Sequence, residues 1–460
     1  MLNQKQTRSN NLNQNIESVF ALPGPKGNFM AGNAIEFGLD PLGFMTRCAQ
    51  QYNDIIPLRL GNSPTILLTN PDLIEFVLKD RELFVTAKAL KSLNTLLGQG
   101  LLTSDGDTWF RQRRLAQPVF HQKRIAGYGE VMINYTEKML QTWRDGETRN
   151  IQADMMRLTF NIVMKTLFSS DVTEEQAHNV ARAMSVAAEW FLAKRKSPIS
   201  LPEQFPTFSN RRYKNAVEQM DKDIYKIINQ RRTSGEDTGD LLSMMMQMRD
   251  EDDGSQMNDQ QLRDAIATII FAGHETSANS LAWTWMLLSQ HPEVQTKLQQ
   301  ELQFVLGDRS ATVADLPALR YTNMVIKETM RLYPVVWNVV SESTRDCEIG
   351  GYHVPAGCTI IMSQWVMHRS ERFFEQPEVF NPERWAGDLE KQLPRGVYLP
   401  FGDGPRICIG KSFALMESVL LLASIAQKFE ITLVPGQSII PQPTITLQPN
   451  NAIKVVLKQR

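Results

Sequence analysis

The sequence predicts an α+β fold that is predominantly α, built as one large domain. Hydrophobic residues make up 42% and charged residues 22% of the 460, which is ordinary globular usage in a chain long enough to bury a large core. Helical periodicity dominates residues 107–304, and short β-rich runs flank this block on both sides. Strands from both ends should pair with each other, which argues against two independent domains.

The N-terminal residues 1–20 are expected to form a polar, disordered tail, followed by the folded domain at 21–460. Residues 1–18 are rich in Asn and Gln and contain neither a spanning apolar run nor the hydrophobic core of a signal peptide. We therefore expect a cytoplasmic protein. The segment 22–27 contains two prolines and two glycines, so it should be a non-helical strap into the fold.

Four short runs rich in β-branched or aliphatic residues predict strands, at 55–59, 65–68, 359–362 and 431–434. Between the first two, Gly61-Asn62 indicates a turn. The longest apolar stretch, 265–288, is interrupted by His274 and Glu275, so it predicts a buried helix rather than a membrane span.

Charge and cysteine content exclude other classes of protein. Lys and Arg number 49 against 50 Asp and Glu, so the net charge of −1 gives no field that would attract nucleic acid. The four cysteines have no paired spacing and are too few for a disulfide framework. We expect no nucleic-acid partner and a reducing compartment.

The strongest chemical signal is a glycine-rich loop, FGDGPRICIG at 401–410, which presents a single cysteine before the helical pattern of 411–422. Backbone N–H groups and a helix N-terminus can stabilise a thiolate there, and glycines let a flat cofactor approach the backbone. The loop resembles the haem-binding signature FxxGxRxCxG of the cytochrome P450 monooxygenases. Its five fixed positions are matched by Phe401, Gly404, Arg406, Cys408 and Gly410.

This resemblance implies haem b as cofactor, with Cys408 as the axial ligand of the iron. The alternative is a buried, inert cysteine after a turn. Arg406 could meet a haem carboxylate through two hydrogen bonds. A thiolate ligand pushes electron density onto iron and favours cleavage of dioxygen, so the implied reaction is monooxygenation of an unactivated C–H bond.

A second motif, Glu328-x-x-Arg331, has the spacing of an ion pair on one helix face. With Arg384 it resembles the family's Glu-Arg-Arg network, which is read as a structural brace because buried charges persist only when they are paired. Taken alone, the motif could equally be a solvated surface pair.

A third motif, Ala272-Gly273-His274-Glu275-Thr276, resembles the family's oxygen-activating helix segment. The resemblance implies that Thr276 hydrogen-bonds dioxygen and that Glu275 relays protons. His274 occupies the variable position and is not expected to be a ligand or a base. The alternative is a satisfied polar cluster in the core.

The fourth motif is Trp109-x-x-x-Arg113, which resembles the family's WxxxR contact to a haem propionate. Many relatives carry a further propionate arginine where this chain has Ser341, so Trp109, Arg113 and Arg406 would have to hold the carboxylates without it. The motifs run from Trp109 to Gly410, so the resemblance covers nearly the whole chain.

The chain shows no nicotinamide or flavin site and has only about fifty residues after the haem loop. A separate electron donor is expected, a ferredoxin or flavodoxin with its reductase. Two other classes stay open: a haem-binding sensor or carrier without turnover, and a haem-thiolate isomerase or dehydratase that needs no donor.

The resemblance also places pocket walls at 85–105, 184–213, 335–340 and 444–447. Their residues are mostly apolar and favour a hydrocarbon-like substrate: Leu90, Leu93, Leu97, Val335, Val336, Trp337 and Ile445. A long-chain fatty acid is our first interpretation, and a sesquiterpene or other terpenoid is the alternative. Lys88 and Lys91 are candidate carboxylate anchors, and the apolar, proline-rich segment 198–208 suggests peripheral membrane contact.

Overall fold

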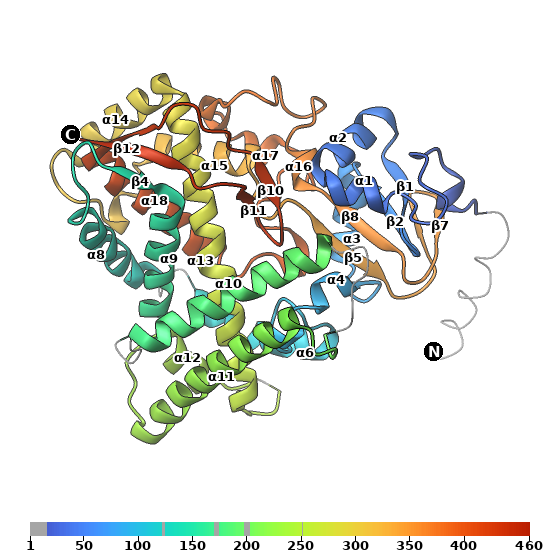
Figure 1. The fold of residues 1–460 in the computed structure, drawn as a ribbon, viewed down its shortest axis with the longest axis horizontal. Coiled ribbons are helices and arrows are strands. Elements are labelled where there is room, and N and C mark those ends of the chain that lie inside the picture. The colour runs from blue at the N-terminus through green and yellow to red at the C-terminus, as the bar shows by residue number, and fades with distance from the viewer. Residues whose placement is uncertain (1–15, 122–124, 170–173, 197–202, 251) are drawn as a thin grey trace. The chain divides into compact units, whose positions relative to one another are not determined.

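The computed structural model describes residues 16–121, 125–169, 174–196, 203–250 and 252–460 (Figure 1). The chain divides into two compact units, each assembled from separate stretches of sequence. The first unit contains the residues up to Ala89 with 338–375 and 393–407, and the second contains 90–337, 376–392 and 408–460. The fold is α+β and predominantly α, as predicted. The single-domain organisation stays a prediction.

The first unit is built on a five-stranded sheet with the order β1-β2-β8-β5-β3. Its strands are β1 (Ile55–Leu60), β2 (Ser63–Leu68), β3 (Phe84–Thr86), β5 (Val339–Ser343) and β8 (Thr359–Met362). Gly61, with φ of 65°, turns β1 into β2, and β2 runs parallel to β8 with Ile66 opposite Ile360. The prediction that strands from both parts of the chain share a sheet is therefore confirmed.

Short helices complete this unit around the sheet. They are η1 (Val19–Ala21), α1 (Ala34–Leu39), α2 (Pro41–Gln51), α3 (Pro71–Lys79), α16 (Gln364–Met367) and η6 (Gly404–Arg406). Helix α4 (Lys88–Lys91) contains residues of both units. Strands β6 (Cys347–Ile349) and β7 (Tyr352–Val354) form a small hairpin. Asn70 caps α3 by accepting hydrogen bonds from two backbone N–H groups, with proline at the first helical position. Val19, inside the expected tail, is buried. Residues 1–15 of that tail lie outside the described residues.

The second unit consists mainly of helices. They are α5 (Asn94–Leu97), α6 (Gly106–Ala116), η2 (Gln117–Phe120), η3 (Ala126–Tyr128), α8 (Gly129–Leu140), α9 (Ile151–Phe168), α10 (Glu174–Lys196), α11 (Phe208–Ser234), α12 (Leu241–Gln247), α13 (Asp259–Gln290), α14 (Pro292–Leu306), η4 (Val313–Asp315), α15 (Arg320–Leu332), η5 (Pro382–Trp385), α17 (Leu389–Gln392) and α18 (Lys411–Lys428). Its strands are β4 (Thr148–Asn150), β9 (Phe429–Leu433), β10 (Pro441–Pro443), β11 (Leu447–Pro449) and β12 (Lys454–Gln459).

Helix α13 is the central element of this unit. It starts with a capping box in which Asn258 and Gln261 satisfy each other's backbone N–H groups, and it packs against α9, α11, α15 and α18. Most of its residues are buried, so the predicted buried helix over 265–288 is confirmed. Within the described residues, no helix is long and apolar enough to cross a bilayer.

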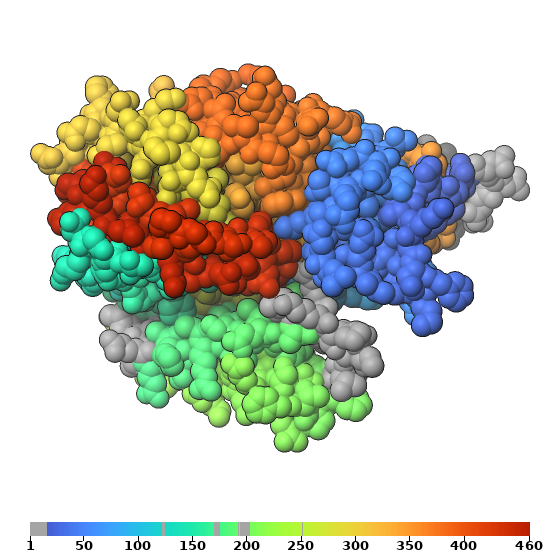
Figure 2. Space-filling model, turned by 45° about the horizontal axis from the view of Figure 1, so that its top comes forward, coloured from blue at the N-terminus to red at the C-terminus, as the bar shows by residue number. Residues whose placement is uncertain are grey.

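The C-terminal strand β12 is the central strand of a sheet in the second unit. β12 pairs with both β9 and β4 in a three-stranded antiparallel sheet, with Lys454 opposite Asn150. Figure 2 shows this C-terminal segment (red) at the surface beside the chain near residue 145 (teal). β9 covers most of the strand predicted at 431–434.

Candidate active site

The cysteine loop crosses the boundary between the two units at Ile407 and Cys408. Within the first unit, Gly402 and Gly404 have φ of 70° and 67°, in the left-handed region that favours glycine. A Cβ atom at Gly404 would lie 2.4 Å from the carbonyl oxygen of Leu78, so only glycine fits there. The side chain of Asp403 accepts the N–H of Gly404 at 2.7 Å and starts the short helix that carries Arg406.

Cys408 lies immediately before α18 in the second unit, and it is accessible although protein surrounds it on most sides. Desolvation by these surroundings raises the pKa of the thiol. The backbone N–H of Gly410 and the positive charges of Arg113 and Lys411 act in the opposite direction, in that order. This donor set stabilises negative charge on an accessible sulfur, which is what ligation of a metal by a thiolate requires.

Helix α6 carries Trp109 and Arg113 one turn apart. Trp109 is buried, whereas Arg113 is partly exposed. Burial lowers the pKa of Arg113, and the charge of Cys408 raises it, so the two side chains are close enough to interact electrostatically. The structure therefore brings the cation of the WxxxR motif to the cysteine.

A short strip of α13 is accessible although the helix around it is buried. Ala272 is exposed, and Gly273 and Thr276 are partly exposed. The Thr276 hydroxyl donates to the carbonyl oxygen of Ala272 at 2.6 Å. On the other side, a Cβ atom at Gly273 would lie 3.2 Å from Val163 of α9, so the absence of a side chain allows close packing there. The strip offers small atoms and one hydroxyl to a flat ligand.

Glu275 and His274 are both buried beside this strip and have separate partners. A carboxylate oxygen of Glu275 accepts the hydroxyl of Thr446, which in turn accepts the amide of Asn279 at 3.4 Å. His274 Nδ1 lies 2.7 Å from the carbonyl oxygen of Ile270, and burial lowers the pKa of His274. The lowered pKa favours the neutral form of His274, whose Nδ1 is engaged by the backbone of its own helix.

Thr446 and Asn279 were not singled out from the sequence. Thr446 lies about 170 residues beyond Glu275, and the only local signal is the alternation of hydroxyl and apolar residues in 444–447. Asn279 follows Glu275 by one helical turn, a spacing that could have suggested a shared polar face.

The structure assembles the predicted charged network completely within the second unit. Arg331 Nε and Nη2 donate to the two carboxylate oxygens of Glu328 at 2.9 and 2.8 Å, and both side chains are fully buried. Arg384 Nε, the backbone N–H of Asn381 and Trp385 Nε1 donate to the same carboxylate at 2.9, 3.0 and 2.9 Å. A solvated surface pair is therefore excluded. A buried carboxylate that accepts several charge-assisted hydrogen bonds can hold these segments together, which is the structural role expected of the network.

Four of the predicted pocket residues pack together in one hydrophobic cluster: Leu90, Leu93, Leu97 and Ile445. The cluster includes Ile270 and Phe271 of α13, directly before the accessible strip. Two other predicted walls, 335–340 and 444–447, are joined by hydrogen bonds, from Trp337 Nε1 to the Thr444 carbonyl at 3.1 Å and from the Leu447 N–H to the Val335 carbonyl at 2.7 Å. Val336 is exposed.

The two candidate carboxylate anchors have acidic partners within the protein. Lys88 Nζ lies 2.9 Å from Glu342, and Lys91 Nζ lies 2.9 Å from Asp105. Ser341, the position of the missing propionate arginine, lies in β5 opposite Thr86 and Ile360. The side chains of 194–196, in the second predicted pocket wall, lie outside the described residues, as does the segment 197–202.

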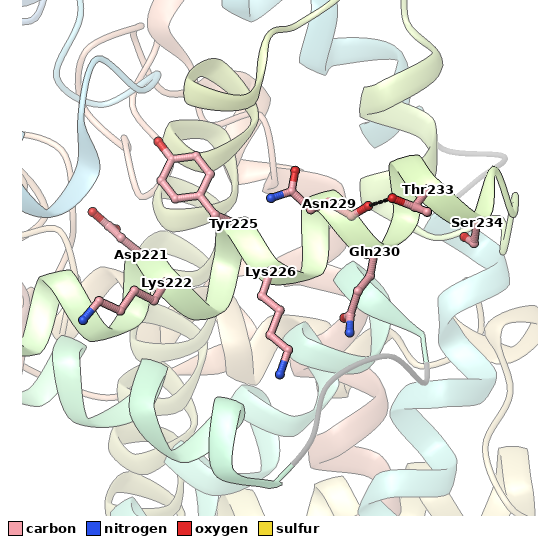
Figure 3. A pocket seen from close by; sticks show the side chains of 8 residues that line it. All are labelled: Asp221, Lys222, Tyr225, Lys226, Asn229, Gln230, Thr233 and Ser234. Atoms are coloured by element: carbon pink, nitrogen blue, oxygen red, sulfur yellow. Dashed lines mark hydrogen bonds between the residues drawn. The ribbon is translucent and has the colours of Figure 1, made fainter.

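A surface pocket lies along α11 and contains none of the predicted site residues (Figure 3). Its lining comes from this helix alone: Asp221, Lys222, Tyr225, Lys226, Asn229, Gln230, Thr233 and Ser234. The close-up shows Lys226 and Gln230 pointing away from Tyr225 and Asn229, so these polar groups do not converge on one point (Figure 3). We do not assign a catalytic role to this pocket.

Comparisons with known proteins agree with the geometry of the site. The model of the cytochrome P450 family matches residues 22–456. The chain is 34% identical over 425 residues to cyclooctatin synthase of Streptomyces melanosporofaciens, covering 92% of each protein. It is 29% identical to pentalenene oxygenase of Streptomyces avermitilis, covering 94% of this chain and 96% of that one. Among solved structures, the heme domain of cytochrome P450DA matches with a TM-score of 0.84 and 26% identity, over 95% and 98% of the two chains.

The chain therefore belongs to the cytochrome P450 family and is a monooxygenase. The family's haem-thiolate cofactor, when bound, supplies the activation of dioxygen, and an electron donor must reduce it. The accessible Cys408, the positive charges of Arg113 and Lys411 that oppose the desolvation of its thiol, and the open strip on α13 fit this cofactor. Membership in a family of oxygenases favours an enzyme over a haem sensor or carrier.

Proposed function

We propose that this protein hydroxylates an unactivated C–H bond of a cyclic terpenoid. Two relatives at 34% identity and one at 29% are named for cyclooctatin, cyclooctat-9-en-7-ol and pentalenene, which are compounds of that class. The observation that carries the proposal is that Lys88 and Lys91 already form ion pairs with Glu342 and Asp105. A fatty-acid carboxylate would have to compete with these acids, whereas a terpene hydrocarbon needs no charged anchor.

The comparisons thus support the terpenoid alternative better than our first interpretation, a long-chain fatty acid. The apolar cluster around Leu93, Leu97 and Ile445 would accept either substrate. The charged groups decide between them, because an unpaired carboxylate inside such a cluster costs several kcal/mol.

In this proposal Cys408 holds the iron of haem b, and Trp109, Arg113, Phe401, Gly404, Arg406 and Gly410 contact the cofactor. In the structure the Thr276 hydroxyl donates to the carbonyl oxygen of Ala272. In the cofactor-bound enzyme this hydroxyl would instead donate a hydrogen bond to dioxygen. Glu275, held by Thr446, is the proton-carrying group next to it. Ala272 and Gly273 provide the space for the flat ring.

We further propose a ferredoxin or flavodoxin as the electron donor, with no flavin or nicotinamide bound by this chain. Peripheral membrane contact also stays a proposal. Phe205 and Phe208, next to the start of α11, are both exposed and could enter a lipid surface that delivers an insoluble substrate. Flotation with phospholipid vesicles tests this: Phe205→Ser should weaken flotation, and a protein that never floats would contradict it.

The substrate test compares a sesquiterpene hydrocarbon with palmitate, using the holoenzyme with a ferredoxin and its reductase. We expect the terpene to displace water from the haem, seen as a shift of the Soret band, and to yield a hydroxylated product. Lys88→Gln and Lys91→Gln should leave terpene binding unchanged, as should the matched surface control Lys391→Gln. Tight palmitate binding that is lost in the Lys88 or Lys91 variant, but not in the control, would establish the fatty-acid interpretation instead.

A further inference from the structure

A buried acid of α13 holds part of the first predicted pocket wall by its backbone. Asp264 is 3% exposed, and one of its carboxylate oxygens accepts the backbone N–H of Gln99 at 2.9 Å. The carbonyl oxygen of Gln99 accepts the side-chain amide of Gln112, a buried residue of α6. Side chains of two helices therefore hold the backbone of residues 93–100, which we call the wall segment.

The wall segment has the backbone geometry that this contact requires. Helix α5 ends at Gly98, whose φ of 57° lies in the left-handed region, so the chain leaves the helix there and presents the N–H of Gln99 outward. A Cβ atom at Gly98 would collide with the carboxylate of Asp264, and one at Gly100 would collide with the hydroxyl of Thr268. Two glycines thus allow the segment to lie against α13 at backbone distance.

The wall segment also forms one side of the apolar cluster beside the candidate active site. It contributes three fully buried leucines: Leu93, Leu96 and Leu97. The cluster also contains Ile270 and Phe271, which directly precede the accessible strip of α13. Thr268, the contact of Gly100, lies one helical turn before Ala272 of this strip, which is about 6 Å along the helix axis. The distance of the segment from α13 therefore sets the space beside the strip.

The buried acid depends on the donor that the wall segment supplies. Arg263, which is also buried, directs Nε and Nη2 to Asp221 of α11 and Nη1 to Asp264 at 3.1 Å. Two further bonds to Asp264 come from the Gln99 N–H and from the side-chain amide of Gln260 at 2.8 Å. A buried carboxylate is costly unless several donors surround it, so the acid and the segment hold each other in place.

We propose that Asp264 is a positioning residue that fixes the wall segment against α13 and thereby selects the ligands that fit beside the strip. A charged acceptor suits this role because its hydrogen bonds are roughly twice as strong as those of a neutral one. The selection acts on apolar ligands bulky enough to contact the three leucines. It requires the haem site but not a terpenoid substrate, so it can fail or hold independently of the substrate class proposed above.

The first measurement is hydrogen–deuterium exchange of the full-length, haem-loaded protein, read by mass spectrometry of peptides covering 93–104. Asp264→Ala should speed exchange there severalfold, because the Gln99 N–H loses its acceptor. Asp264→Asn keeps an acceptor oxygen without the charge and should give an intermediate rate. Gln99→Ala removes an exposed side chain, leaves both backbone bonds in place and should change nothing. Asp240→Ala removes a different buried acid, the partner of Arg231, and is the control for lost stability; it should leave exchange over 93–104 unchanged.

The second measurement compares the binding of imidazole and phenylimidazole, which ligate haem iron and shift the Soret band whatever the natural substrate is. In Asp264→Ala the dissociation constant of phenylimidazole should rise about tenfold, because a mobile wall must be ordered when the phenyl ring packs against it. The constant of imidazole, which is too small to reach the leucines, should stay nearly the same. The ratio of the two constants should equal that of the wild type in Gln99→Ala and Asp240→Ala.

Unchanged exchange over 93–104 in Asp264→Ala would show that the acid does not hold the wall segment, and would overturn the proposal. Faster exchange with a phenylimidazole constant that is unchanged or lower would show that the segment does not select ligands, and would overturn it as well. An equal change of the ratio in Asp240→Ala would attribute the effect to lost stability. If Asp264→Ala does not fold, Asp264→Asn decides, since wild-type exchange and a wild-type ratio there would refute the role of the charge.

Discussion

Replacement of Glu328 by glutamine is expected to destabilise the protein severely. Two donors, Arg331 Nε and Trp385 Nε1, bond to one carboxylate oxygen, and three, from Arg331, Arg384 and Asn381, bond to the other. An amide nitrogen in place of either oxygen turns at least two of these contacts into donor facing donor. Each buried donor left unpaired costs about 1–3 kcal/mol. Removing one charge of a buried pair costs about 3–5 kcal/mol, and we expect a loss in this range.

The assay is urea unfolding of the haem-loaded protein followed by circular dichroism, with the linear dependence of free energy on denaturant giving the difference. The control is Lys391→Gln, which breaks an ion pair whose side chains are 78% and 74% exposed and should leave the free energy of unfolding nearly unchanged. A Glu328→Gln protein within about 1 kcal/mol of the wild type would refute the argument that the carboxylate is an irreplaceable acceptor. Arg331→Lys gives a second check, since its single ammonium cannot reproduce the two parallel hydrogen bonds.

Three other substitutions have outcomes set by the structure. Cys408→His should abolish the strongly red-shifted Soret band of the reduced carbon monoxide complex while the circular dichroism stays native, and a retained thiolate spectrum would contradict the assignment of Cys408. Thr446→Val removes the hydroxyl bonded to Glu275 and should lower the fraction of electrons that reach product, measured as hydroxylated product per reductant consumed; unchanged coupling would show that Glu275 needs no such support. The Arg309 guanidinium beside Asp315 lowers the pKa of that acid to about 2, so the stability from this pair is present above about pH 4 and lost as the pH falls through 2. Asp315→Asn should therefore lower the free energy of unfolding by about 1 kcal/mol at pH 7, after allowing for solvent screening of the half-exposed Arg309. Below pH 2 it should have no effect. An equal loss at both pH values would refute the ionic explanation.

The sequence predicted those features in which one local pattern determines the structure. The turn at Gly61-Asn62, the long apolar helix and the strand run at 359–362 each follow from periodicity or turn chemistry within a few residues. The Glu328–Arg331 pair follows from helical spacing, and the glycine positions of the cysteine loop follow from backbone geometry. These signals are strong because the interacting atoms are close in the chain.

Contacts between distant segments could not be predicted in the same way. The bond from Thr446 to Glu275 joins residues 171 apart, and the ion pair of Lys88 with Glu342 joins residues 254 apart. Neither pairing leaves a local pattern in the sequence, because each depends on which distant segments the fold brings together. The lysines therefore looked like free carboxylate anchors in the sequence, whereas the structure pairs both of them with acids.

Glu328 and Glu417 show why residue type and burial do not by themselves assign a role. Both side chains are fully buried in the second unit, on the neighbouring helices α15 and α18. Five donors surround the carboxylate of Glu328, so its negative charge is used to fix Arg331 and Arg384 in place. Glu417 has one hydroxyl nearby and no cation, so its pKa rises to about 8 and it stays neutral at pH 7. Stability that depends on the neutral form is complete below the ordinary glutamate pKa of about 4.5 and is lost as the pH rises through 8. Glu417→Gln should thus flatten the alkaline decline in stability, which the same substitution at Glu328 has no reason to do.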